Sequence, residues 1–201
     1  MAKHALFQEE FMWYVIQVMT GKEAIMQELI EHHLPKEVYG DCFYIRRERI
    51  WCLDGEKICH VETMFPGYLF VTAADPKELY WNLKEIPGLT KLLRAEEEVF
   101  LAVSQEEQAF LEDLIDGDRE KIVRLSEVKL DEEKNILSAK GPLRKYVNQI
   151  VKKKIRLCYV MIEKELFGQR RKILIGIRTG EEHNEEKSSD FGSRRPRQSS
   201  C

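Results

Sequence analysis

The stretch "MFPGYLFV", Met64 to Val71, combines a bend with a strand. Pro66 and Gly67 interrupt an apolar run, because proline locks its own φ and glycine adopts conformations that other residues avoid. The residues after the bend are β-prone and include two large aromatic side chains, Tyr68 and Phe70. Local chemistry alone favours a turn that leads into a core strand, because large aromatic side chains are mostly buried.

The residue patterns around this stretch predict an α+β first half. "WYVIQVM" (Trp13 to Met19) is a nearly continuous apolar run, which indicates a central strand buried on both faces. "KEAIMQELIEHH" (Lys22 to His33) is expected to form an amphipathic helix that ends before Pro35. The predicted buried stripe of this helix consists of Ile25, Met26, Leu29 and Ile30.

Turn and capping residues locate the next elements. Asp54 and Gly55 are a hairpin turn signal between two β-rich stretches. One helix is expected after the N-cap Asp75, and another opens with a capping box of Ser104 and Glu107. The positions expected to be buried are Leu79, Leu83 and Ile86 in the first of these helices and Phe110, Leu111 and Leu114 in the second.

From Arg119 onward the pattern changes to short β-rich pieces with turns between them and no helix. "LFGQRRK" (Leu166 to Lys172) is predicted to be the hairpin loop between the last two strands. The expected fold class is therefore an α+β N-terminal domain, an antiparallel sheet with flanking helices, followed by a small all-β barrel. The expected boundaries are residues 12–116 and 117–180, with a polar, disordered tail at 181–201.

Composition excludes several classes of protein. The chain has 201 residues, 43% of them hydrophobic, which is enough for one medium domain or two small ones. No apolar run approaches the roughly 18 residues that span a bilayer, and the first residues do not resemble a secretory signal. The five cysteines form no CxxC pair, which is typical of reduced thiols. We therefore expect a cytoplasmic protein with no membrane contact.

The charges are distributed unevenly along the chain. The net charge is only −3, but Ala95 to Ser138 contains fourteen acidic and five basic residues, and Lys140 to Arg178 contains twelve basic and two acidic ones. A concentrated basic module suggests a local contact with a polyanion. The acidic connector is usually a solvated face and linker, and a secondary interpretation is that it keeps the basic module from binding the first domain or random DNA.

Three basic groups are the candidate RNA-binding residues. Arginine and lysine contact phosphates, and arginine also stacks on or pairs with unpaired bases. Any single lysine among them is more simply explained as solvated surface, whereas the cluster favours RNA if the compact sheet brings the groups into one footprint. The candidates are Arg144, Lys145, Lys152, Lys153, Lys154, Arg156, Arg170, Arg171 and Lys172.

Metal and catalytic sites are not expected. Cys42, Cys52, Cys59 and His60 lack the paired spacing of a zinc site, and neighbouring Cys59 and His60 on a strand would point to opposite faces. No P-loop, nucleophile motif or carboxylate pair with a placed base is present. We expect no cofactor and no enzymatic activity. An RNA-processing enzyme is the alternative from another class, and a metal-dependent nuclease assay would detect it.

The motifs "WYVIQVMTGKE", "MFPGYLFV", "IPGLTKLL" and "EEQAFLEDLI" resemble, in order and spacing, the N-terminal domain of NusG-type transcription factors. "GPL" and "LFGQRRKILIGI" resemble the C-terminal KOW domain of that family. Leu143 follows Gly141-Pro142 where the family has Phe, and a later Gly is missing near Asn148. This divergence is similar to that of specialised paralogs of the LoaP processive antitermination branch, and RfaH-type paralogs are less similar.

The resemblance implies partners and sites. It implies that the bend and the aromatics after it form a hydrophobic cleft for the clamp helices of RNA polymerase, with the candidates Phe65, Pro66, Tyr68 and Phe70. It implies that the helix carrying Tyr80, Trp81 and Asn82 approaches the polymerase gate loop, with non-template DNA as a further contact, and that the basic domain binds a nascent RNA hairpin.

The implied function is that of an elongation factor that suppresses pausing and termination, known as processive antitermination. The alternative is the general NusG role, in which the second domain couples polymerase to a termination factor or to the ribosome.

Overall fold

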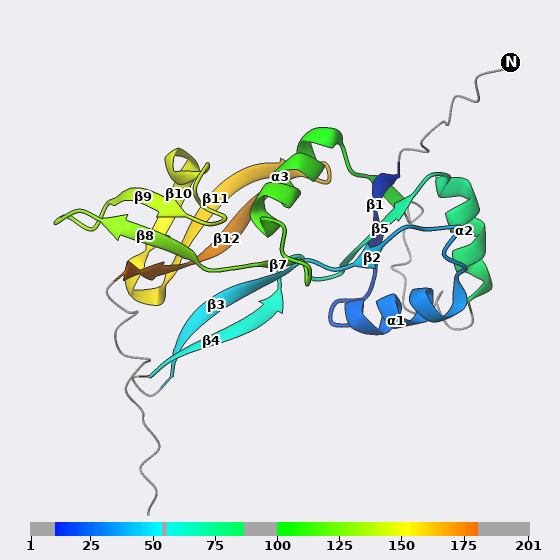
Figure 1. Ribbon diagram of the computed structural model, residues 1–201, viewed down its shortest axis with the longest axis horizontal. Coiled ribbons are helices and arrows are strands. Elements are labelled where there is room, and N and C mark those ends of the chain that lie inside the picture. Colours follow the sequence, from blue (N-terminus) through cyan, green and yellow to red (C-terminus); the bar gives the residue numbers. More distant parts are fainter. Residues whose placement is uncertain (1–10, 54–55, 87–99, 181–201) are drawn as a thin grey trace, which may run out of the picture.

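The computed structural model describes residues 11–53, 56–86 and 100–180 (Figure 1). Its first sheet is antiparallel, with strand order β2-β5-β1-β6. Strand β1 pairs on both sides, as predicted for a central strand, and Val15 lies opposite Phe70 of β5. The strands are β1 (Met12–Gln17), β2 (Cys42–Phe43), β5 (Tyr68–Ala73) and β6 (Phe100–Ala102).

Helices α1 (Glu23–His33) and α2 (Pro76–Glu85) cover one face of this sheet. Helix α2 begins as predicted, because Asp75 Oδ1 accepts a hydrogen bond of 2.8 Å from the Lys77 amide. The predicted stripe of α1 is wrong at Ile25, whose side chain is 45% exposed. Met26 faces the core, and Ile25 lies about 100° away around the helix.

The bend before β5 is attached to α1. Gly67 has a φ of +83°, and a Cβ there would meet the main-chain oxygen of Val18 at 3.0 Å, so this position requires glycine. The Gly67 amide donates a 2.6 Å hydrogen bond to the buried carboxylate of Glu23. This bond explains why a charged residue occupies the buried face of α1.

Strands β3 (Arg46–Leu53) and β4 (Glu56–Thr63) form the predicted hairpin, and its Asp54-Gly55 turn lies outside the described residues. The short strand β7 (Ile122–Val123) pairs in parallel with β3. Helix α3 (Gln105–Ile115) precedes β7 and has the predicted capping box of Ser104 and Glu107. The tail at 181–201 also lies outside the described residues.

The C-terminal region is an all-β, curled sheet with strand order β10-β11-β12-β8-β9. The edge strand β10 comes close to the other edge, because Lys153 donates a 3.3 Å hydrogen bond to the main-chain oxygen of Lys134 in the β8–β9 turn. The predicted fold class is thus confirmed. The strands are β8 (Ser126–Leu130), β9 (Ile136–Lys140), β10 (Ile150–Lys154), β11 (Tyr159–Leu166) and β12 (Gln169–Thr179).

The predicted hairpin loop at Leu166 to Lys172 is too long. Leu166 pairs with Gln169, so the turn consists of Phe167 and Gly168 alone, and Arg170, Arg171 and Lys172 lie on β12. The residues from Gln169 to Lys172 are all polar, which suggested a loop, but they pair with Leu166 to Glu163 and continue the ladder with β11.

Two hydrophobic cores lie on the two faces of the first sheet. Along β5, Leu69 and Val71 point toward α1 and α2, whereas Tyr68 and Phe70 point to the other face. That second face packs against α3 and against the tip of the β11–β12 hairpin (Figure 1). The N-terminal and C-terminal regions therefore share one continuous core. Among the residues that the structure describes, no helix is long and apolar enough to cross a membrane.

Candidate functional site

The aromatic residues of the opening stretch are covered in this structure. Phe65 and Tyr68 are 5% and 8% exposed, and Phe70 is fully buried, whereas Pro66 is exposed. Phe167 of the β11–β12 turn lies among them, with its ring centroid 5.7 Å from that of Phe65, 5.4 Å from Tyr68 and 5.8 Å from Phe70. The aromatics predicted to bind polymerase are thus covered by another part of the same chain.

The turn that carries Phe167 is adapted to this contact. Phe167 and Gly168 both have positive φ, 56° and 68°, the conformation of a two-residue type I′ turn. Glycine and asparagine suit such positions, and a phenylalanine there is uncommon. The Phe167 amide donates a 2.6 Å hydrogen bond to Glu107 Oε1 of α3. The Arg171 guanidinium lies 4.6 Å from the centroid of the Tyr68 ring and donates to the Tyr68 hydroxyl.

Sequence reasoning missed Phe167, because its segment was assigned to a loop and only the basic residues Arg170, Arg171 and Lys172 were selected. The available signal was a large aromatic residue directly before the glycine of a short hairpin turn. Such a residue has no partner within its own turn and needs a surface elsewhere to cover it.

The candidates on α2 lie on a separate surface. Helix α2 covers the face of the first sheet opposite to Phe70. Trp81 is 63% exposed, and the Lys84 ammonium lies 5.0 Å from its ring centroid and 4.2 Å from that of Tyr80. Asn82 Nδ2 donates to the main-chain oxygen of Glu78 on the same helix. The structure therefore separates this exposed group from the covered aromatics.

Two of the basic candidates contact α3. Arg144 Nη1 lies 2.7 Å from Asp116 Oδ1, and Lys145 Nζ lies 2.6 Å from Asp113 Oδ1. The Tyr146 hydroxyl donates to Asp113 Oδ2 at 3.1 Å. The hydrogen bond from Lys145 holds the pKa of Asp113 below its usual value, and burial beside Asp113 raises the pKa of Tyr146 to about 12.

The lysines of β10 have different environments. Lys152 and Lys154 are exposed and share one face of the strand, because side chains alternate along a strand. Lys153 reaches the β8–β9 turn, where it donates to the amide oxygen of Asn135. Arg156 follows on an exposed 3₁₀ turn.

The basic candidates do not form one compact patch. Lys154 lies opposite Tyr159, and Arg170 lies opposite Glu165, so they are separated by six residues of β11, or roughly 20 Å. Arg170 is also paired with Glu163 at 2.7 Å. Lys172 is exposed on β12. The structure thus spreads the predicted footprint over the length of the sheet.

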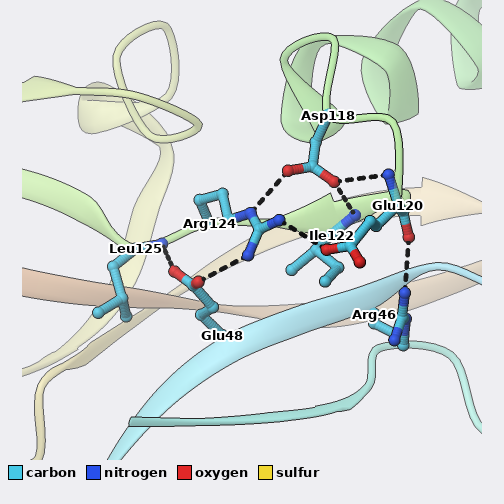
Figure 2. A network of polar contacts seen from close by, with 7 residues as sticks. All are labelled: Arg46, Glu48, Asp118, Glu120, Ile122, Arg124 and Leu125. Atoms are coloured by element: carbon cyan, nitrogen blue, oxygen red, sulfur yellow. Dashed lines mark hydrogen bonds and ion pairs between the residues drawn. The ribbon is translucent and has the colours of Figure 1, made fainter.

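An ionic network joins the hairpin β3–β4 to the segment between α3 and β8 (Figure 2). Arg124 contacts Asp118 at 2.6 Å, Glu48 at 3.0 Å and Glu120 at 3.0 Å. Its pKa is raised, first by the hydrogen bond to Asp118 and then by that to Glu48. Glu48 Oε2 also accepts a 2.9 Å hydrogen bond from the Leu125 amide. The network holds the start of the C-terminal sheet against β3.

The cysteines and histidines are distributed over several elements. Cys42 is buried on β2, and burial raises the pKa of its thiol, whereas Cys59 is exposed on β4. His33 Nδ1 lies 2.9 Å from the main-chain oxygen of Leu29 on its own helix. Within the described ranges, no group of three or more histidine, cysteine, aspartate or glutamate residues is placed to hold a metal ion.

Comparison with known proteins identifies the family. A family model described as "Transcription termination factor nusG" matches residues 11–112, half of the 201-residue chain. No curated protein matches. A solved structure entitled "Domain interaction in Thermotoga maritima NusG" is 19% identical, with a TM-score of 0.46, and the match covers 83% of this chain and 94% of that chain. On the evidence of the family model, this chain belongs to the NusG family of transcription factors.

Proposed function

We propose that this chain is a transcription elongation factor that binds RNA polymerase and suppresses pausing and termination, with its basic C-terminal sheet bound to a nascent RNA hairpin. This is the role of a specialised paralog similar to the LoaP antitermination branch. The observation that supports it most is that the NusG family match includes the whole aromatic site around Tyr68. The C-terminal sheet, which carries the exposed Lys152 and Lys154, comes after the matched residues in the chain.

The polymerase contact would use Phe65, Tyr68 and Phe70, whose rings lie together beneath Phe167 and would bind the tip of a helical hairpin in an aromatic groove. Because Phe167 occupies this face, the clamp helices and the β11–β12 turn compete for the same residues. Polymerase binding therefore requires the turn to withdraw. The exposed Trp81 on α2 would face the gate loop or non-template DNA.

The RNA contact would centre on Lys152 and Lys154, which are exposed on one face of β10. Lysines on an edge strand also prevent pairing with other chains, so exposure does not by itself assign RNA binding. The two explanations differ in salt dependence. Each phosphate contact makes the slope of log affinity against log salt about 0.9 more negative on a duplex, whereas edge protection leaves the slope unchanged.

The test uses the full chain and RNA hairpins from transcribed leader regions, with scrambled sequences as the comparison. Binding is measured by fluorescence anisotropy over a range of salt concentrations. A preference for one hairpin, weakened in a Lys152→Ala/Lys154→Ala variant, supports the proposal. The matched control is Lys129→Ala/Lys140→Ala, which removes two exposed lysines from β8 and β9.

In transcription assays with RNA polymerase, the wild-type chain should increase readthrough of a terminator placed downstream of the preferred hairpin. Equal binding to every hairpin, together with unchanged readthrough, would contradict antitermination. That result would instead favour the general role of coupling polymerase to a termination factor or ribosome.

A further inference from the structure

A cavity of about 680 Å³ lies between the C-terminal sheet and the β3–β4 hairpin. Its walls come from β8 and the turn after it, the 3₁₀ turn Ile155–Leu157, the end of β12, and Lys57 of β4. Small-molecule sites enclose roughly 300–1,000 Å³, so the cavity has the size of such a site. Of the candidates selected from the sequence, only Arg156 lines it.

The floor of the cavity is apolar. Val128 of β8 and Ile177 of β12 are buried, and the partly buried Leu130 and Ile155 line the same space. Thr179 lies two residues after Ile177, so its side chain is on the same face of β12 and brings one hydroxyl to the floor. A flat, largely apolar group gains free energy by leaving water for such a surface.

The rim of the cavity is cationic. Within the described ranges, no hydrogen bond or ion pair engages the side-chain nitrogens of Lys129, Lys134 or Arg156. Many other basic side chains of the C-terminal sheet are paired with carboxylates. Unpaired cations gathered around a cavity attract an anionic ligand. The cationic rim consists of Lys57, Lys129, Lys134 and Arg156.

Two carboxylates also line the cavity, and only one of them is directed to its own turn. Asp131 Oδ1 accepts a 2.7 Å hydrogen bond from the Asn135 amide, and Oδ2 accepts one of 3.0 Å from the Asn135 side chain. These bonds hold the pKa of Asp131 below its usual value. Glu132 is exposed and accepts N–H donors. The cavity thus has more cations than carboxylates, with one carboxylate available to a ligand.

We propose that this cavity binds a free nucleoside diphosphate, with its base on the apolar floor and its phosphates at the cationic rim. Lys129, Lys134 and Arg156 donate to the phosphate oxygens. The base lies against Val128 and Ile177. Such a site goes beyond the proposed function, because it takes a small molecule and does not include the exposed lysines of β10.

The three chemistries of the cavity select this ligand over simpler anions. A fatty acid has one charge and leaves most of the rim unpaired, and inorganic phosphate leaves the floor uncovered. The Glu132 carboxylate and the Thr179 hydroxyl add hydrogen bonds that a heterocyclic base makes and a hydrocarbon does not. A continuing RNA strand would carry further phosphates past Asp131 and Glu132, so a free nucleotide fits the charges better.

The test measures binding of ADP and GDP to the full chain by isothermal titration without divalent cations. Pyrophosphate supplies the phosphates without the base, and adenosine supplies the base without the phosphates. We expect ADP or GDP to bind about tenfold or more tightly than either fragment, because floor and rim then act together. No binding of either nucleotide at millimolar concentration, or equal affinity for pyrophosphate, would overturn the proposal.

A pair of variants locates the site. Lys129→Ala/Lys134→Ala removes two exposed cations of the rim, and we expect it to weaken nucleotide binding about tenfold or more. Lys77→Ala/Lys140→Ala is the matched control, because it removes the same charge from exposed positions on α2 and β9. An equal loss in the control would mean that net charge alone acts, and it would overturn the site. Amide NMR shifts on ADP addition should concentrate at residues 128–134 and 177–180, and shifts confined to other residues would also overturn it.

An RNA hairpin is the other source of the same chemistry. For a free nucleotide, Lys129→Ala/Lys134→Ala keeps the wild-type affinity for the hairpin, and the hairpin does not displace ADP. Displacement of ADP, together with weaker hairpin binding in this variant, would assign the cavity to a nucleotide of RNA and overturn the proposal. Lys152 and Lys154 are unchanged in the variant, so a failure of hairpin binding in the wild type would leave the ADP result standing.

Discussion

The replacement of Phe167 by Asn separates the covering of the aromatic site from the folding of the hairpin. Phe167 and Gly168 have the positive φ values of a type I′ turn, for which Asn-Gly is the preferred pair. Phe167→Asn therefore keeps or improves the turn while it removes the ring that lies on Phe65, Tyr68 and Phe70. Asparagine relieves the strain of the turn equally whether Phe167 lies on the aromatic residues (the covered form) or has withdrawn from them (the uncovered form). Only the lost ring contact therefore changes the equilibrium between the two forms.

The size of this shift follows from the burial of Phe167, which is 7% exposed. Burying a phenylalanine side chain contributes about 1.5–3 kcal/mol, and favourable ring pairs add about 0.5–1.5 kcal/mol. The contact is thus worth about 2–4 kcal/mol, or about 30- to 700-fold in the balance between covered and uncovered forms. Affinity for the clamp helices should rise with the uncovered fraction, until that form predominates.

The assay is titration of a labelled clamp-helix fragment with the full chain, followed by anisotropy. Leu137→Asn is the control, because Leu137 is 66% exposed on β9, outside the contact. We expect a large gain in affinity for Phe167→Asn and none for the control. A Phe167→Asn variant that is folded, judged by circular dichroism, but binds the fragment no better than wild type would refute the idea that this ring blocks the site.

The other predictions concern residues of both the N-terminal and the C-terminal region. In a Phe167→Asn background, Tyr68→Ala should weaken clamp-helix binding by more than about 1 kcal/mol if Tyr68 is an anchor, and isothermal titration checks this. Lys152→Ala/Lys154→Ala should lower the salt slope of RNA binding by about two in anisotropy titrations, and an unchanged slope would exclude phosphate contacts there. Gly176→Ala should lower the free energy of urea unfolding by about 1–3 kcal/mol, because its Cβ would meet the Glu48 main-chain oxygen at 2.5 Å. The lowered pKa of Asp113 means that its ion pair stabilises the contact above the usual value of 3.8 and is lost as the pH falls through the lowered pKa; the protection factor of the Phe167 amide, the intrinsic exchange rate divided by the observed rate at the same pH, should fall there, and less so in Asp113→Asn.

Local signals predicted the elements well where residues next to each other in the chain decide the conformation. Asp75 and Ser104 cap helices because their side chains reach amides two or three residues ahead. Gly67 adopts positive φ because of its own lack of a side chain and the nearby main chain. These interactions operate over a few residues, so the sequence contains all the information needed to predict them.

Errors arose where a neighbouring element determines the outcome. Ile25 fits the apolar stripe of α1, but the buried carboxylate of Glu23, held by the Gly67 amide, sets which side of the helix faces the sheet. Arg170 to Lys172 were assigned to a loop because they are polar, but pairing with β11 makes them part of a strand. Neither the partner of a carboxylate nor the partner of a strand is visible in a local window.

The sequence by itself determined the two regions, the bend and strand at Met64 to Val71, the uneven charge and the resemblance to NusG, because composition, periodicity and motif order carry these. Only the tertiary structure decided that Phe167 covers Tyr68 and that Asp113 holds Lys145. These pairs are 99 and 32 residues apart in the chain. Whether such distant groups meet depends on how the two sheets pack through their shared core, and no local pattern encodes that packing.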